Sequence, residues 1–151
     1  MKTFKSKIDA SMGDNRGLKG VTSKLDIGDN SIYVKTSWLD GKIVHLDITL
    51  SRGGRTHFDD LPKSEAMAQL ESDNYDLARS WVEDSCRLAS SLLESGVDIT
   101  AIIDNWKGVK GFPHGACSQL ERIVCGPLHA TALLIERNME AWKADIDAWV
   151  G

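Results

Sequence analysis

Residues 31–50 carry the pattern of a β-hairpin, which limits the folds open to this chain. The stretch SIYVKTSWLDGKIVHLDITL contains two runs rich in β-branched and aromatic residues, separated by Asp40-Gly41. That dipeptide accepts the positive φ angles of a tight turn, so the two runs are predicted to pair as antiparallel strands. Alternation places these residues toward one buried face: Ile32, Val34, Thr36 and Trp38 from the first strand, and Val44, Leu46, Ile48 and Leu50 from the second.

Helices are predicted in the middle of the chain. Between residues 76 and 95 the apolar residues come in adjacent pairs, 77/78, 81/82, 88/89 and 92/93, with Cys86 between them. This pattern indicates a helix with a wide buried face, and Gly96 stands where a C-terminal cap is expected. A second helix is predicted over 98–107 with Asp98 as N-cap, and a short helix after Ser64 precedes both.

The last part of the chain is predicted to be a long helix over 127–149. Pro127 suits the first turn of a helix. One seam of that helix has heptad spacing, which is typical of a helix packed lengthwise on another helix: Leu128, Ala132, Ile135, Met139, Trp142, Ile146, Trp149. If the rest of the domain leaves its end uncovered, the seam becomes an interface between copies of the chain, formed by Met139, Trp142, Ile146 and Trp149.

Length and composition indicate one globular domain spanning 1–151. The chain has 42% hydrophobic and 26% charged residues and a formal net charge of -4, so it lacks the broad positive field that non-specific nucleic-acid binding requires. No apolar run follows the basic N-terminus, which predicts a cytoplasmic location and no membrane span. Three cysteines without a secretion signal favour reduced thiols over a disulfide framework.

These elements together predict an α+β fold. We expect a small antiparallel sheet led by the 31–50 hairpin and packed against three or four helices, with a long C-terminal helix. The first 30 residues carry scattered glycines and charges, so an N-terminal arm is predicted over 1–20 with one short strand near 21–25. A C-terminal helical extension is predicted from about residue 137 to 151.

Two segments have residues suited to binding an anionic ligand. The loop after the hairpin contains Arg52, Gly53, Gly54 and Arg55. Glycine lets backbone N–H groups approach an anion closely and arginine donates in pairs, although an ordinary surface loop has the same composition. In NWKGVKGFPHG, the side chains of Lys110, Phe112 and His114 are candidates for stacking a base and holding its phosphate, while Trp106 is assigned to the core.

A zinc site is an alternative for the segment that follows. His114, Cys117, Cys125 and His129 supply the ligand types that zinc prefers. Zinc motifs more often pair Cys with Cys and His with His, so we favour the explanation that the cysteines pack as small apolar residues. The sequence contains no known catalytic motif that pairs a nucleophile with a general base. Cys86 lies in the middle of a predicted helix and is expected to be inert.

The order of these pieces resembles the TSCPD family. The resemblance rests on SIYVKTSWLDGKIVHLDITLSRGG (31–54), on LARSWVEDSCRLASSLLESGVDITAIIDNWKGVKG (77–111) and on residues 123–135, where a Cys-Pro element opens a helix. Domains of this family occur near the C-terminus of adenosylcobalamin-dependent ribonucleotide reductases and as free-standing proteins in bacteria and viruses. The chain departs from the family at two cysteine positions. In a gap-free comparison Gly126 stands at the signature cysteine, and only a one-residue shift places Cys125 there. Gly111 stands at the position after KGVK, where the family tends to carry another cysteine.

The residues and the resemblance lead to one expected function and two alternatives. We expect a non-catalytic accessory module that binds a phosphate-bearing small molecule or nucleotide as a homo-oligomer, without a cofactor. The first alternative is a protein–protein interaction module, such as a viral inhibitor or accessory subunit, that uses the C-terminal stripe. The second alternative is a zinc-binding protein.

Overall fold

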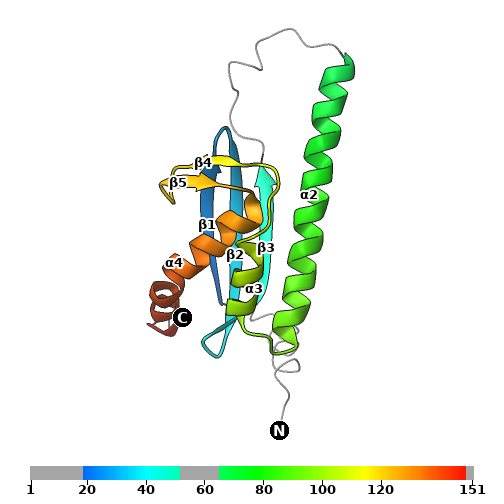
Figure 1. Ribbon diagram of the computed structural model, residues 1–151. Helices are drawn as coiled ribbons and strands as arrows, with labels where there is room; N and C mark the ends of the chain where they lie inside the picture. Colours follow the sequence, from blue (N-terminus) through cyan, green and yellow to red (C-terminus); the bar gives the residue numbers. More distant parts are fainter. Residues whose placement is uncertain (1–18, 52–64, 149–151) are drawn as a thin grey trace.

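The computed structural model describes residues 19–51 and 65–148. Its elements are, in chain order, β1 (Lys19–Ile27), β2 (Asn30–Leu39), β3 (Lys42–Ser51), α2 (Glu65–Glu94), α3 (Ile99–Trp106), β4 (Gly115–Cys117), β5 (Arg122–Val124) and α4 (Pro127–Ala148). The strands form one antiparallel sheet in the order β3-β2-β1-β4-β5, and the helices cover one of its faces (Figure 1). This confirms the predicted α+β fold with a long C-terminal helix.

The predicted hairpin is present as β2 and β3. Its turn residues Asp40 and Gly41 have φ angles of 52° and 74°, as a tight turn of this type requires. Every residue assigned to the core by alternation is buried, including Ile32, Val34 and Leu46. Tyr33 and Lys35 between them point to the open face of the sheet, where Lys24 lies 6.0 Å from the ring centre of Tyr33. The sheet therefore has one covered and one open face.

β1 is longer and better paired than predicted. It runs from Lys19 to Ile27 and pairs with β2 over its whole length, so residues 19 and 20 of the predicted arm belong to the strand, which extends past 21–25. Residues 1–18 of the predicted arm lie outside the described residues. The connection to β2 is a tight turn in which Gly28 has a φ angle of 57°. Because β1 lies in the middle of the sheet, it belongs to the core.

α2 is one continuous helix, whereas a short helix and a separate longer one were predicted. No glycine or proline interrupts residues 65–94, so no residue in this range ends the helix. Ser64, the predicted cap, lies outside the described residues. α2 lies along β3 (Figure 1), and the Ser90 hydroxyl is 3.1 Å from both the backbone N and the carbonyl O of Leu46. The helix thus covers backbone groups of an edge strand.

α3 and α4 begin where predicted. The Asp98 carboxylate accepts from the Thr100 backbone N–H at 2.9 Å and caps α3. In the C-terminal seam, Leu128, Ala132, Ile135 and Ile146 are buried, and Met139 and Trp142 pack half-buried against the same core. Trp149 lies outside the described residues. Of the residues proposed as an interface, Ile146 is therefore buried and two more are half-buried within one chain.

The second hairpin, β4 and β5, was not predicted. Its strands have three residues each, too short for alternation to show in the sequence. Long-range pairing holds it in place, because Cys117 pairs with Ile27 of β1. None of the helices described in 65–148 is long and apolar enough to span a membrane.

Candidate ligand-binding site

The outer side of α2 is more apolar than a solvated helix face usually is. The predicted wide face divides into two stripes, of which one is buried: Ala78, Val82, Cys86, Ala89 and Leu93. The other stripe is exposed, with Leu77 50%, Trp81 63%, Leu88 65% and Leu92 42% accessible. The prediction that both members of each pair are buried was wrong, because the sheet reaches only one of the two stripes. Exposed apolar surface of this kind usually marks a binding surface.

Next to this helix, the segment 107–113 is held by a close backbone contact with the turn before α4. The Gly111 backbone N–H donates to the carbonyl oxygen of Cys125 at 2.9 Å. A Cβ on Gly126 would lie 2.6 Å from the Gly111 nitrogen and 3.1 Å from its Cα. Glycine at 126 is therefore what allows the two backbones to touch. The contact sets where Lys110 and Phe112 lie.

A cavity of about 430 Å³ lies between α2 and this segment. Its α2 wall includes Leu77, Trp81 and Val82, and the opposite wall is formed by residues 109–112 and the start of α4. The lining is almost entirely apolar, with Lys110 and Asp84 as its charged members. A planar apolar group with one anionic substituent fits that chemistry.

The structure brings together only some of the predicted ligand residues. Lys110 and Phe112 line the cavity, and Phe112 is 44% exposed. His114 is also exposed but does not line it. The predicted anion loop, Arg52 to Arg55, lies outside the described residues. Trp81 and Leu77 were missed as site residues because their spacing is that of an ordinary core helix.

The four zinc candidates are not arranged as a metal site. The buried His129 ring accepts, through Nδ1, the Cys125 backbone N–H at 2.9 Å, so one imidazole nitrogen is already used by the turn. Cys117 is buried, Cys125 is exposed, and the Cys117 thiol faces Gln119 Oε1 at 3.9 Å. Within residues 19–51 and 65–148, no group of three or more His, Cys, Asp or Glu side chains is suited to a metal ion.

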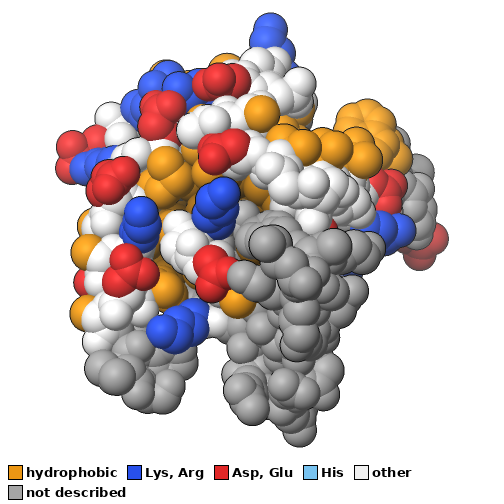
Figure 2. Space-filling model, turned by 90° about the horizontal axis from the view of Figure 1, so that it is seen from below, with side chains coloured by type: hydrophobic (Ala, Val, Ile, Leu, Met, Phe, Trp, Pro, Cys, Tyr) orange, Lys and Arg blue, Asp and Glu red, His pale blue; other side chains and the backbone are white. Residues whose placement is uncertain are grey.

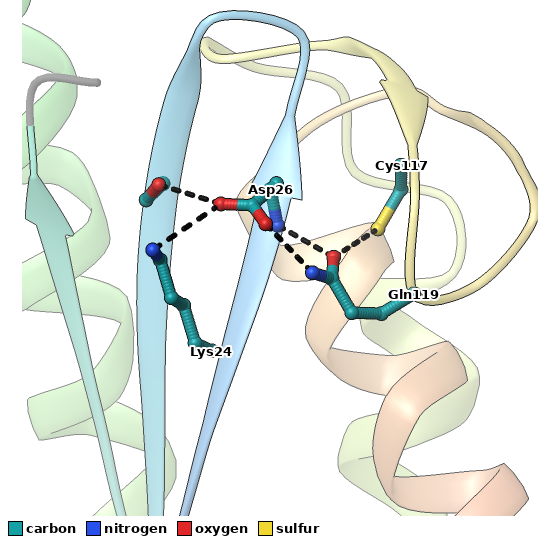
Figure 3. A network of polar contacts seen from close by, with 5 residues as sticks. Lys24, Asp26, Cys117 and Gln119 are labelled. Carbon is teal, nitrogen blue, oxygen red and sulfur yellow. Dashed lines mark hydrogen bonds and ion pairs between the residues drawn. The ribbon is translucent and has the colours of Figure 1, made fainter. Parts of the chain in front are cut away.

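Asp26 and Gln119 fasten the second hairpin to the sheet (Figure 3). The Gln119 amide donates to Asp26 Oδ2 and accepts from the Asp26 backbone N–H, both at 2.7 Å. Hydrogen bonds from Gln119 and from the Ser31 hydroxyl lower the pKa of Asp26 below its ordinary value. These groups have structural partners, which explains the lowered pKa without a catalytic role.

The burial of His129 predicts a pH-dependent stability. Desolvation, with a smaller contribution from the charge of Arg122, lowers its pKa below the ordinary value of 6.5. As the pH falls, the unfolded chain therefore takes up a proton before the folded chain does. The contribution of neutral His129 to the free energy of unfolding is complete above pH 6.5 and is lost as the pH falls below it. We expect the free energy of unfolding in urea to decrease less steeply in His129→Gln than in the wild type between neutral pH and pH about 5. Equal slopes would contradict the assignment.

A second cavity, of about 440 Å³, lies at the end of the molecule where the β2–β3 turn and the C-terminal end of α2 meet. Lys42 and Lys143 line it together with Asp98 and Glu140. Figure 2 views this end and shows basic and acidic side chains interspersed around hydrophobic ones. Because both positive and negative side chains line this cavity, it favours neither an anionic nor a cationic ligand. The cavity beside Trp81 is the better candidate.

The geometry defines a two-layer α+β domain whose helical layer carries a surface cavity. The chain matches the TSCPD domain over residues 5–134 and belongs to that family. Neither a curated protein nor a solved structure shows a significant match. Residues 135–148 of α4 continue the helix beyond the matched range without a break. Gly111 and Gly126, the two glycines singled out in the comparison with the family signature, are the pair whose backbones touch.

Proposed function

We propose that this TSCPD protein is a non-catalytic module that binds a planar, negatively charged small molecule of the nucleotide class. The observation that carries the proposal is the cavity of about 430 Å³ in which the exposed rings of Trp81 and Phe112 occur together with Lys110. Its volume lies in the range of small-molecule sites.

The lining suggests how such a ligand would lie. The aromatic rings and aliphatic walls favour a base, because stacking and apolar burial both act on a planar ring. Lys110 supplies the positive charge for a phosphate, while Asp84 on the α2 side disfavours an anion and accepts hydrogen bonds from hydroxyl or amino groups. The phosphate is therefore placed at the Lys110 side. Arg52 and Arg55 remain candidates for additional phosphate contacts, on sequence grounds alone.

The titratable groups support binding without bond-making chemistry. Burial raises the pKa of the Cys86 thiol to about 12, so this cysteine stays protonated and unreactive. Asp98 has a lowered pKa because the Thr100 backbone and hydroxyl donate to it in the α3 cap. Asp26 and His129, whose pKa values are also shifted, are hydrogen-bonded to neighbouring groups of the fold. None of the four lines the proposed site.

Binding of adenosine monophosphate, measured by calorimetry and by tryptophan fluorescence, tests the proposal. Phe112→Ala and Lys110→Ala are each expected to weaken binding by about tenfold, since each removes one stacking or charged contact. Arg52→Ala with Arg55→Ala tests the anion loop separately. Tyr33→Ala and Lys143→Ala are matched controls that remove an exposed ring and an exposed lysine elsewhere. Saturable binding that Phe112→Ala and Lys110→Ala leave unchanged would refute the site.

A further inference from the structure

The exposed stripe of α2 has a symmetry that the proposed ligand site does not explain. Leu77, Trp81, Leu88 and Leu92 are separated by 4, 7 and 4 residues. At about 100° per residue they fall within an arc of about 60° on the helix surface, in one line about 22 Å long. The spacing is the same in both directions. In a two-fold contact between antiparallel helices, residue i meets residue j while j meets i, so a spacing that is the same in both directions places every apolar residue of the stripe opposite another.

We propose that two copies of this chain pair antiparallel through the outer stripe of α2. The two-fold axis passes between Asp84 and Ser85, the midpoint of the stripe. Leu77 of one copy then lies opposite Leu92 of the other, and Trp81 opposite Leu88. Side chains that are 42% to 65% exposed in one chain become the centre of an interface. The inference does not rest on the proposed ligand.

The charged side chains beside the stripe can pair with the same side chains of a second copy. Asp84 and Arg87 are exposed, 3.7 Å apart, and lie on the same flank of the stripe, away from the core. In an antiparallel pair related by a two-fold axis, each flank meets the same flank of the other helix. In the proposed register the two Asp84 carboxylates lie beside the axis on this flank, and Arg87 of each copy lies about 3 Å further along the helix from the Asp84 of the other. Two positive and two negative charges therefore surround the axis. Such an arrangement favours this register over shifted ones.

The opposite flank of the stripe offers room for the partner helix. A further cavity of about 420 Å³, lined by Leu88, Leu92 and Val97, continues the one beside Trp81, and both cavities share Ser85. The two form one apolar groove between α2 and the α3 side of the molecule. Pairing covers the groove along its length and removes its exposed apolar surface from water. It uses Trp81 and Leu77 of the proposed ligand cavity, so pairing and nucleotide binding compete for this surface. In the α4 seam, by contrast, Ile146 is buried and Met139 and Trp142 are half-buried within the chain.

Sedimentation equilibrium of the full chain tests the pairing. The wild type is expected to dimerise, and Leu88→Glu to raise the dimer dissociation constant at least about 100-fold, since a charge then lies in the centre of the interface. Ile123→Glu is the matched control, because Ile123 is 72% exposed on β5 and carries the same change outside α2. Circular dichroism checks that both variants fold, as expected for exposed positions. Ile123→Glu should dimerise like the wild type.

A charge exchange tests the register. Asp84→Arg places four positive charges around the axis and is expected to weaken the dimer at least about tenfold, whereas Asp84→Arg combined with Arg87→Asp restores the balance and the affinity. A wild type that remains monomeric at millimolar concentration overturns the inference. So does a dimer that Leu88→Glu leaves intact, or a double variant as weak as the single one. Adenosine monophosphate is absent from these experiments, so their failure and the failure of the ligand proposal are distinguishable.

Discussion

Gly126→Ala is expected to lower the free energy of unfolding by about 2–3 kcal/mol, as typical for overpacking against fixed neighbours. The added Cβ would lie 2.6 Å from the backbone nitrogen of Gly111, and the three nearest atoms are all backbone. No side-chain rotation relieves such a clash, so one segment must move. The hydrogen bond from the Gly111 N–H to the Cys125 carbonyl is then lengthened or lost, which itself costs about 1 kcal/mol.

Urea unfolding of Gly126→Ala beside Gly108→Ala measures this effect against a matched control. A Cβ on Gly108 would lie 3.7 Å from the nearest atom, the carbonyl oxygen of Asn105, which is an ordinary contact. Gly108→Ala should therefore change stability by no more than about 1 kcal/mol, and can even stabilise by restricting the unfolded chain. Because the contact positions Phe112, Gly126→Ala should also weaken nucleotide binding. A Gly126→Ala protein as stable as Gly108→Ala would contradict the close approach.

Leu93→Ala and Leu92→Ala are expected to differ strongly although the residues are neighbours. Leu93 is 1% exposed and packs in the core, so its truncation should cost about 3 kcal/mol through lost burial and the cavity left behind. Leu92 is 42% exposed, and its truncation should cost less than about 1 kcal/mol in a single chain. The comparison decides which stripe of α2 faces the sheet.

Both variants should be unfolded in urea at a concentration where the chain is monomeric, because Leu92 also belongs to the proposed interface. Sedimentation under the same conditions verifies that state. Equal losses of stability would mean that both stripes are covered, and a larger loss for Leu92→Ala would mean that the helix is rotated from its assigned position.

Local signals predicted the parts of the fold that depend on neighbouring residues. Asp40-Gly41 predicted the β2–β3 turn, and Gly96 predicted the end of α2. Asp98 and Pro127 predicted the starts of α3 and α4. Gly96 indeed has a φ angle of 98°, and the Val97 N–H donates to the Leu92 carbonyl beyond the helix end. Each of these depends on the conformation or hydrogen bonding of a few consecutive residues, which a sequence shows directly.

The remaining features depend on contacts between distant segments. The pairing of β1 with β4 joins Ile27 to Cys117, and nothing in the short β4 sequence indicates this partner. Helical periodicity predicted one wide apolar face on α2 but not which part of it the sheet covers, since this depends on where β3 lies. The contact of Gly111 with Gly126 is equally invisible in a sequence with 13 glycines. The candidate site arises from these long-range placements, which is why Trp81 was assigned to the core.

Amide and indole chemical shifts during a titration with adenosine monophosphate show whether the surface beside Trp81 binds the nucleotide. We expect progressive shifts of the backbone amides at Lys110, Gly111 and Phe112 and of the Trp81 indole N–H. The indole of Trp38, buried and donating to the Thr36 hydroxyl at 2.8 Å, should stay in place as an internal reference. Absence of any shift at millimolar nucleotide, or shifts confined to residues away from this cavity, would contradict the account.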